Sequence, residues 1–400
     1  MKTLSTRILV ILFLLGTQSC KKKIAELEYK ERGTLIEYNL KGTIPESGIV
    51  PRINEFDAQD IVQNGVNYYS ITYRTIYEGK QINSRGLLLV PEHVDSAYLI
   101  AYFHGTQIPI NLSAFYESKY ETPSNYEGQG NNFIETRNIG LAWASAGYIV
   151  FLPDYIGFGA TENKEHPYLA YDELFKSNID GLLAVKQFLA EKGITYDNRL
   201  FLSGWSQGGG ASLSAHKFIQ EQYASEFTVT ASSSLAGPYN LRGFMDDILS
   251  RKDEELITNN IFSWGLYSLN KFSPELKRPT DQFYSYPVYD QYSAIFTPSQ
   301  IPSQTFKAYF LANIIDGSDA AMNQVINRNT FSSGWNPVGK VFLHHGDADE
   351  IVYYYNATDA MEGLGNAGGD VTLYTYLGGT HLSDVGLYTQ NTLNDFNALK

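Results

Sequence analysis

A serine flanked by glycines, at the end of an apolar run, has the surroundings that nucleophilic chemistry requires. Residues 204–208 read Gly-Trp-Ser-Gln-Gly, with two more glycines directly after them. In a G-x-S-x-G pattern the serine lies on a strained turn between a strand and a helix, where small neighbours keep the backbone free of clashes. Because the flanking residues favour a strand before it and a helix after it, we predict that Ser206 is a nucleophile and not a structural loop serine.

A serine hydroxyl becomes a good nucleophile only when a histidine, oriented by a carboxylate, accepts its proton. For this type of turn the order along the chain is serine, acid, histidine. The histidines after Ser206 are His216, His344, His345 and His381. His216 falls in the predicted helix behind the serine, and no equally well-placed acid lies between Ser206 and the pair at 344–345. His381 follows the last predicted strand in a glycine-rich loop, so we predict that it is the base.

The acid is expected in the loop after the strand that ends at Gly346. The spacing Gly-x-x-Asp-x-x-Val from Gly346 to Val352 selects Asp349, with Asp347 in reserve. Asp349 would hold His381 in the correct tautomer and stabilise the imidazolium that forms. We therefore predict Ser206, His381 and Asp349 as the catalytic residues.

A metal site in the same segment is the competing interpretation, since His344, His345, Asp347 and Asp349 lie close together in sequence. Neighbouring residues of a strand point to opposite faces of a sheet, so both histidines would not readily join one site. We predict neither a metal nor a cofactor.

The remaining requirement is a pair of donors for an oxyanion. One is the backbone amide after the nucleophile, that of Gln207, and the other comes from the loop after an earlier strand. The stretch His104-Gly105-Thr106-Gln107 supplies that loop. We predict the amide of Thr106 as the second donor, with Gln107 as the alternative, and a plain tight turn as the structural interpretation.

Apolar runs that end in Gly- or Pro-containing loops predict strands buried on both faces of a mostly parallel sheet. An antiparallel hairpin (69–77 and 85–90) precedes them, and the runs are 96–103, 147–154, 198–204, 227–232, 339–346 and 370–379. Helical patterns lie between or after them, at 175–193, 209–223 and 381–400. The fold class predicted is α/β, with a central sheet and flanking helices.

One stretch interrupts this alternation. Residues 238–335 are far longer than a connection between neighbouring strands needs, and they are rich in aromatic residues. We predict an inserted, mostly helical cap. Its aromatics would line an apolar substrate site, although for most of them packing within the cap is the simpler explanation.

The N-terminus resembles an export signal. Lys2 and Arg7 precede a short apolar stretch, residues 8–15, which is too brief to span a bilayer. The end of this segment, Gly-Thr-Gln-Ser-Cys, resembles a bacterial lipoprotein signal, in which the cysteine becomes the lipidated first residue. That resemblance implies a signal over residues 1–19, lipidation at Cys20 and a membrane-anchored or secreted protein, with a free cysteine as the alternative.

Composition excludes several classes of protein. The chain carries a net charge of −13 and a single cysteine. Nucleic-acid binding through phosphates is not expected of so acidic a chain, and no intrachain disulfide can form. Residues 20–45 are predicted to be a tether or linker with an entry strand, and residues 46–400 to be the folded unit. The sequence does not determine the oligomeric state.

Together the motifs HGTQ, LPDYIGFG, GWSQGG, HGDADEIV and GGTH resemble the α/β-hydrolase superfamily, and within it the secreted lipases and esterases with a cap before the acid-bearing strand. The resemblance covers roughly residues 66–400. It implies the α/β-hydrolase fold and a loop after an early strand, here Pro153-Asp154-Tyr155, near the substrate. Residues expected to line the cleft are His104, Gln107, Asp154, Tyr155 and Trp205, although a purely structural role for Asp154 and Tyr155 is at least equally consistent with the pattern.

The expected activity is hydrolysis of a carboxylic ester, a small-molecule substrate, through an acyl-enzyme. A capped aminopeptidase with the same catalytic residues is the first alternative. It would need an acidic group in the cap, and residues 246–255, DDILSRKDEE, leave that open. A non-catalytic binding lipoprotein is the second, but a binding protein has no need for the three catalytic residue types in order.

Overall fold

The computed structural model describes residues 31–53, 59–109, 111–112, 116–117, 121–130, 133–296 and 298–400. The predicted signal, residues 1–19, and Cys20 lie outside these residues. Within the described part of the chain, no helix has the length and apolar character that crossing a membrane requires.

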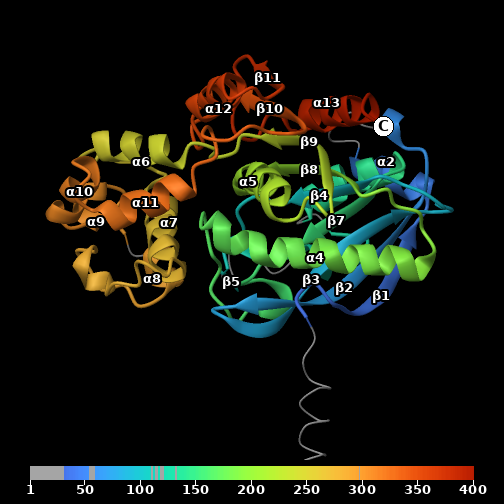
Figure 1. The fold of residues 1–400 in the computed structure, drawn as a ribbon, viewed down its shortest axis with the longest axis horizontal. Helices are drawn as coiled ribbons and strands as arrows, with labels where there is room; N and C mark the ends of the chain where they lie inside the picture. Colours follow the sequence, from blue (N-terminus) through green and yellow to red (C-terminus); the bar gives the residue numbers. More distant parts are fainter. Residues whose placement is uncertain are drawn as a thin grey trace, which may run out of the picture.

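One large sheet of nine strands organises the described residues, in the order β1-β2-β3-β7-β4-β8-β9-β10-β11 (Figure 1). The strands are β1 (Leu35–Ile44), β2 (Val66–Tyr77), β3 (Lys80–Pro91), β4 (Leu99–Phe103), β7 (Ile149–Pro153), β8 (Arg199–Trp205), β9 (Thr228–Leu235), β10 (Lys340–Gly346) and β11 (Val371–Tyr376). Pairing is antiparallel from β1 to β7 and parallel from β7 to β11. A separate pair, β5 (Asn111–Leu112) with β6 (Tyr116–Glu117), lies outside this sheet.

Every strand predicted from an apolar or alternating run is present, and the mostly parallel α/β sheet is confirmed. All residues of β4 and β7 are buried, as expected for strands covered on both faces. Because parallel strands end at the same edge, the loops after β4, β8, β10 and β11 are brought together there. These are the loops that carry the predicted site residues.

The entry strand predicted within residues 20–45 is the edge strand β1, residues 35–44. Its register with β2 runs from Leu35 to Ile44. The ring of Tyr38 packs 4.9 Å from that of Phe188, and Lys192 lies over the same tyrosine. Aromatic and cation–π contacts therefore fasten a polar segment to the sheet, so the folded unit begins before residue 46.

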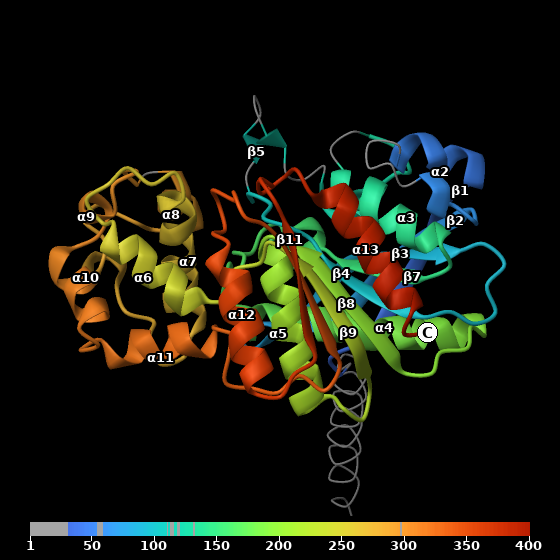
Figure 2. The ribbon, with the colours of Figure 1, turned by 90° about the horizontal axis from the view of Figure 1, so that it is seen from above.

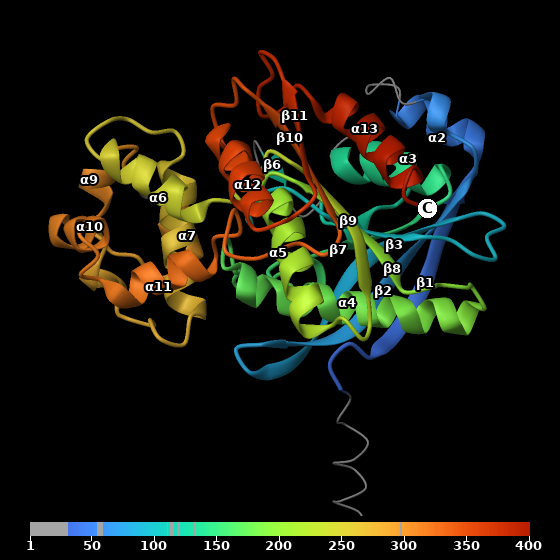
Figure 3. The same ribbon diagram turned by 45° about the horizontal axis from the view of Figure 1, so that its top comes forward.

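Helices cover both faces of the sheet (Figures 2 and 3). One face packs against α4 (Tyr171–Lys192), α5 (Gln207–Gln222) and α12 (Tyr355–Asn366), and the other against α2 (Glu46–Ile53), α3 (Leu141–Ser145) and α13 (Val385–Asn397). The three predicted helices correspond to α4, α5 and α13. As predicted, α4 ends at Gly193, which takes the left-handed conformation (φ 69°) that favours glycine at a helix end.

The insertion between β9 and β10 forms a helical cap beside the sheet (Figure 1). Its helices are α6 (Leu241–Ser250), α7 (Asn259–Phe272), α8 (Gln291–Phe296), α9 (Pro302–Thr305), α10 (Ala308–Ile315) and α11 (Ala320–Arg328). Its aromatics mainly pack on one another: Phe283 lies 5.3 Å from Phe310, and Phe262 lies 5.5 Å from Phe306. Packing, the simpler of the two explanations, therefore accounts for most of them.

Short helical turns complete the chain: η2 (Gln59–Ile61), η4 (Pro123–Asn125), η5 (Glu135–Gly140), η6 (Gly159–Thr161) and η7 (Thr280–Gln282). Of these, η5 is a π-helix that leads directly into α3. Single π-turns are rare and are found frequently at functional sites. This one begins at Glu135.

Candidate active site

Ser206 lies on the turn between β8 and α5, in a strained backbone conformation with φ 56° and ψ −124°. Strands β4 and β8 and helix α5 pack so closely that no side chain fits at the neighbouring glycines. A Cβ atom on Gly208 would lie 1.8 Å from the carbonyl oxygen of Phe103, and one on Gly204 would lie 2.3 Å from that of Gly208. The glycines of the motif thus allow a turn that presents the serine at the edge of the sheet.

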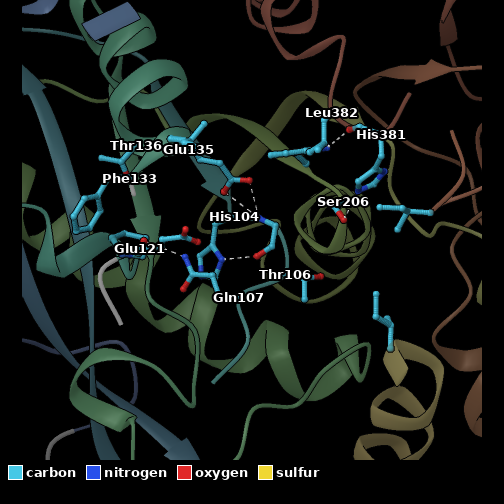
Figure 4. A pocket seen from close by; sticks show the side chains of 16 residues that line it. His104, Thr106, Gln107, Glu121, Phe133, Glu135, Thr136, Ser206, His381 and Leu382 are labelled. Atoms are coloured by element: carbon cyan, nitrogen blue, oxygen red, sulfur yellow. Dashed lines mark hydrogen bonds between the residues drawn. The ribbon is translucent and has the colours of Figure 1, made fainter. Parts of the chain in front are cut away.

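The loops after β10 and β11 bring the other two predicted residues to the serine. Nε2 of His381 lies 2.9 Å from Oγ of Ser206, and Nδ1 of the same ring lies 2.8 Å from Oδ2 of Asp349. Figure 4 shows Ser206 and His381 facing each other at the end of the pocket. Residues separated by up to 175 positions in sequence therefore form one continuous hydrogen-bond chain.

Backbone and side-chain donors hold the Asp349 carboxylate. Its Oδ1 accepts from the amides of Ile351 and Val352, at 2.8 and 2.9 Å. Burial alone would raise the pKa of Asp349, but hydrogen bonds from His345 and His381 outweigh burial and lower that pKa well below its usual range. The carboxylate is therefore ionised at neutral pH, as a partner of an imidazolium must be.

The reserve acid and the other histidines have separate partners. Asp347 accepts from the amide of Gly378 at 2.6 Å. His216 is buried in α5, 2.9 Å from the hydroxyl of Ser232. His344 contacts Ser233 and Tyr376 on one face of the sheet, whereas His345 approaches Asp349 on the other. The two adjacent histidines thus point in opposite directions, which was the reason for preferring the serine site over a metal site.

The first predicted oxyanion donor is the amide of Gln207, the first residue of α5. The N–H of a first helical residue points away from the carbonyls of its own helix, and the helix dipole is positive at this end. The Gln207 side chain turns back into the protein, where its Nε2 lies 2.6 Å from Nε2 of His166. Burial lowers the pKa of His166 to about 3, so this ring is neutral and accepts the hydrogen bond.

The second predicted donor lies in the loop after β4. Thr106 lines the pocket with Ser206, and its hydroxyl lies 3.0 Å from that of Tyr168. Tyr168 in turn stacks on Trp264 of the cap, with ring centroids 4.0 Å apart. Sequence reasoning missed Tyr168, because nothing in its local pattern separates it from the many other tyrosines.

The model of the family described as LIP, secretory lipase, matches residues 140–394. This chain belongs to that family. It is accordingly a carboxylic ester hydrolase, and the predicted lipase and esterase relationship is confirmed. A search of curated proteins finds no match.

Solved structures show the same fold as this secretory lipase. A Legionella pneumophila protein assigned to the hydrolases has 21% identity and a TM-score of 0.76, with 91% of this chain and 98% of that chain covered. The rice cell wall degrading esterase LipA from Xanthomonas oryzae, in a ligand-bound form, has 21% identity and a TM-score of 0.73, with 93% and 100% covered. Candida antarctica lipase A in its closed state has 16% identity and a TM-score of 0.65, with 92% and 83% covered. The α/β-hydrolase fold is confirmed.

The pocket beside Ser206 has a volume of about 340 Å³ and a mainly apolar lining. It is lined by His104, Gly105, Thr106, Gln107, Glu121, Pro123, Phe133, Ile134, Glu135, Thr136, Trp205, Ser206, Ile261, Ile351, His381 and Leu382 (Figure 4). The cap contributes Ile261, from α7, to this lining. Three of the predicted cleft residues, His104, Gln107 and Trp205, are among them, and Trp205 also donates from Nε1 to the carbonyl of His381 at 3.1 Å.

Asp154 and Tyr155 are not among the described residues that line the pocket, so their prediction as cleft residues was wrong. Both are fully buried. Asp154 accepts from the amide and hydroxyl of Ser124, and Tyr155 donates to the carbonyl of His104. Burial raises the pKa of Asp154 to about 6. The loop after β7 therefore has a structural role, the other interpretation of its motif, and Tyr155 connects it to the loop that begins at His104.

Glu135 is a pocket residue that the sequence analysis did not identify. Both of its carboxylate oxygens lie 3.0 Å from the backbone nitrogen of Gly105, and its side chain projects into the pocket (Figure 4). Burial, reinforced by the nearby Glu121 and opposed by the hydrogen bond from the Gly105 amide, raises the pKa of Glu135 to about 8. A lone glutamate at the start of a helical segment carries no motif, so only the fold reveals its position beside the nucleophile.

Proposed function

We propose that this secretory lipase family member cleaves carboxylic esters by acyl transfer through Ser206, His381 and Asp349. The observation that carries the proposal is the hydrogen-bond chain from Ser206 Oγ through both ring nitrogens of His381 to Asp349 Oδ2. In such a chain the histidine accepts the serine proton while the carboxylate fixes its tautomer and stabilises its positive charge.

In the first half of the reaction Ser206 Oγ attacks the ester carbonyl carbon, and its proton passes to Nε2 of His381. The carbonyl oxygen becomes an oxyanion that the amides of Gln207 and Thr106 stabilise. The bond between the carbonyl carbon and the alcohol oxygen then breaks, and the His381 proton passes to the leaving alcohol. In the second half water attacks the acyl-enzyme, His381 accepts a water proton, and the acid leaves as Ser206 regains its proton.

The pocket supports a substrate with an apolar acyl or aryl group. Phe133, Ile134, Ile261, Ile351 and Leu382 are among the apolar residues that line it. Burying such a group displaces water and strengthens the polar interactions at the reacting carbonyl. Ile261 reaches the pocket from the cap, so the cap takes part in forming the acyl site.

The aminopeptidase alternative needs a free acidic group in the cap, and four of the five acids in residues 246–255 are paired, Asp246 with Arg242 among them. Asp247 and Glu254 pair with Arg251, and Asp253 pairs with Lys252. In the described part of the chain none of residues 246–255 lines the pocket. We therefore propose ester hydrolysis alone.

Initial rates on acetyl, butyryl, octanoyl and palmitoyl p-nitrophenyl esters, beside aminoacyl p-nitroanilides, test the proposal. Ester turnover is expected in the wild-type protein, and loss of roughly 10⁴-fold or more in Ser206→Ala. A fluorophosphonate should label the wild type and not the variant. Ester turnover that survives in Ser206→Ala, or turnover of the anilides alone, would overturn it.

For localisation we propose export with lipid anchoring at Cys20 after removal of residues 1–19. Membership of a secretory family supports export, and the charged and apolar pattern of the first nineteen residues supports the signal. Cys20→Ala should move the protein from the membrane fraction to the soluble fraction. A variant that stays in the membrane fraction would exclude the anchor.

A further inference from the structure

The peptide that carries the second oxyanion donor is held on both sides of Gly105. The Gly105 amide donates to the carboxyl group of Glu135 at 3.0 Å, and the Gly105 carbonyl lies 2.8 Å from Nδ1 of His104. A carbonyl oxygen only accepts, so Nδ1 of His104 carries the proton of this bond. Burial lowers the pKa of His104 to about 4, which leaves the ring neutral at pH 7.

These two contacts determine where the next amide points. The carbonyl of Gly105 and the N–H of Thr106 belong to one planar trans peptide, in which they point in opposite directions. Fixing the Gly105 carbonyl against His104 therefore fixes the Thr106 N–H on the other side. Because Gly105 is free to rotate about its own backbone bonds, the orientation of this peptide also needs an anchor at the Gly105 amide, and Glu135 supplies that anchor.

Only Gly105 lies between Glu135 and the nucleophile at this point. A Cβ atom on Gly105 would lie 3.1 Å from Oε1 of Glu135 and 3.6 Å from Cβ of Ser206. Figure 4 shows the carboxyl group directed toward the loop that carries Thr106. Glu135 itself is anchored by its place at the start of the π-helix η5, which continues into α3.

We propose that Glu135 is a positioning residue for ester hydrolysis, holding Gly105 so that the Thr106 amide faces the oxyanion. This inference rests on the proposed function, since it assumes an oxyanion beside Ser206. Glu135 would act through the backbone of Gly105 and make no contact of its own with the reacting atoms.

The charge of Glu135 adds a measurable signature. The titratable groups that interact electrostatically with it are Glu121 in the loop before η4, Tyr102 on β4, Tyr155 after β7 and Tyr388 on α13. Burial disfavours ionisation of Glu135, and so does Glu121, the other acid among them; together they raise the pKa of Glu135 to about 8. Glu135 is then neutral at pH 7, and its ionisation above pH 8 would place a negative charge beside a developing oxyanion.

Steady-state kinetics of three variants over pH 6–10 test the inference. Glu135→Ala removes the acceptor for the Gly105 amide, so kcat should fall about 10- to 100-fold at pH 7 while KM changes less than about threefold. Glu135→Gln keeps an acceptor oxygen and cannot ionise. It should retain kcat within about threefold at pH 7 and lose the decline in kcat/KM that the wild type shows above pH 8.

Glu121→Gln is the matched control, because it removes a pocket carboxylate that has no part in holding Gly105. It should shift the alkaline decline to lower pH, since loss of Glu121 makes ionisation of Glu135 easier. Wild-type kcat in Glu135→Ala, or an unchanged alkaline decline in Glu135→Gln, would overturn the inference. Residual activity of Ser206→Ala in the same assay would instead overturn the proposed function, so the two failures are distinguishable.

Discussion

Nε2 of His345 lies 3.2 Å from Oδ2 of Asp349, the same oxygen that accepts from Nδ1 of His381 at 2.8 Å. The His345 nitrogen also lies 2.6 Å from the carbonyl oxygen of Val352. Because that oxygen only accepts, Nε2 of His345 carries a proton and donates to both neighbours. His345 thus orients the acid of the candidate triad.

Replacing this donor tests its contribution. His345→Phe leaves Asp349 with one donor fewer and leaves the Val352 carbonyl buried without its partner. We expect kcat to fall about tenfold, equivalent to roughly 1.4 kcal/mol, and the free energy of unfolding to fall by about 1–3 kcal/mol. Ester turnover and urea unfolding measure the two effects. His344→Phe, on the other face of the sheet, is the control, and an equal loss of kcat in both variants would contradict a specific role for His345.

Gly208 should be the glycine least tolerant of substitution, because a Cβ atom there would lie 1.8 Å from the backbone oxygen of Phe103. Since backbone atoms cannot move aside as a side-chain end can, Gly208→Ala must displace either β4 or the start of α5. We expect a loss of at least about 2 kcal/mol in the free energy of unfolding and of most ester turnover.

A matched alanine substitution lies in α12. Around Gly365 no atom lies within 4 Å of the position of an added Cβ. Gly365→Ala should therefore raise the free energy of unfolding by about 0.5–1 kcal/mol, since alanine is the better helix former. Thermal unfolding of both variants compares them, and equal effects would show that the contact at Phe103 is relieved without cost.

Much of the sheet and of the hydrogen-bond chain at Ser206 could be predicted from sequence, because both leave local patterns. Buried strands are continuous apolar runs, and Ser206, Asp349 and His381 each follow such a run in a loop with characteristic glycines. The order of the residues along the chain, with the helix expected around His216 and the glycine-rich loop at His381, was enough to choose among four histidines. No three-dimensional information was needed for that choice.

The supporting residues could not be predicted, because their roles arise from contacts between distant segments. Glu135 reaches Gly105 from 30 positions away, and Tyr168 reaches Thr106 from 62. The sequence shows the motif at Asp154 but not the direction of its side chain. The Asp154 carboxyl group accepts a hydrogen bond from Ser124, and no sequence motif marks Ser124. Packing decides such positions, and one sequence does not encode packing in a local pattern.

Buried Asp154 should make stability depend on pH in the mildly acidic range. Burial raises its pKa to about 6 in the folded protein, compared with about 3.9 in an unfolded chain. Between these values the folded state binds more protons than the unfolded state, so this group's contribution falls as pH rises from about 4 to about 6. Above pH 6 the contribution is constant.

Asp154→Asn removes that dependence. The free energy of unfolding of the variant, relative to the wild type, should rise by roughly 2–3 kcal/mol between pH 4 and pH 7. Urea titrations at both pH values measure the change. The control is Asp253→Asn, at an exposed residue whose pKa is lowered by its hydrogen bond to Lys252. Parallel behaviour of the two variants would show that burial of Asp154 is not the cause.

Ile261 is the cap residue that should set acyl length. A pocket of about 340 Å³ is near the lower end of ligand pockets, which are about 300–1,000 Å³. We therefore expect the wild type to favour butyryl over palmitoyl p-nitrophenyl esters. Ile261→Ala removes apolar volume from the cap side and should increase the palmitoyl-to-butyryl ratio of kcat/KM by about 10-fold, within the range for small changes in an apolar pocket.

Ile257 supplies the matched control for this prediction. It lies just before α7, is 65% exposed and does not line the pocket. Ile257→Ala should leave the ratio of the two esters unchanged, because the volume beside Ser206 stays the same. If both variants change the ratio equally, movement of the whole cap controls acyl selection. If neither changes it, the acyl group does not reach α7 and binds on the side of Phe133 and Ile134.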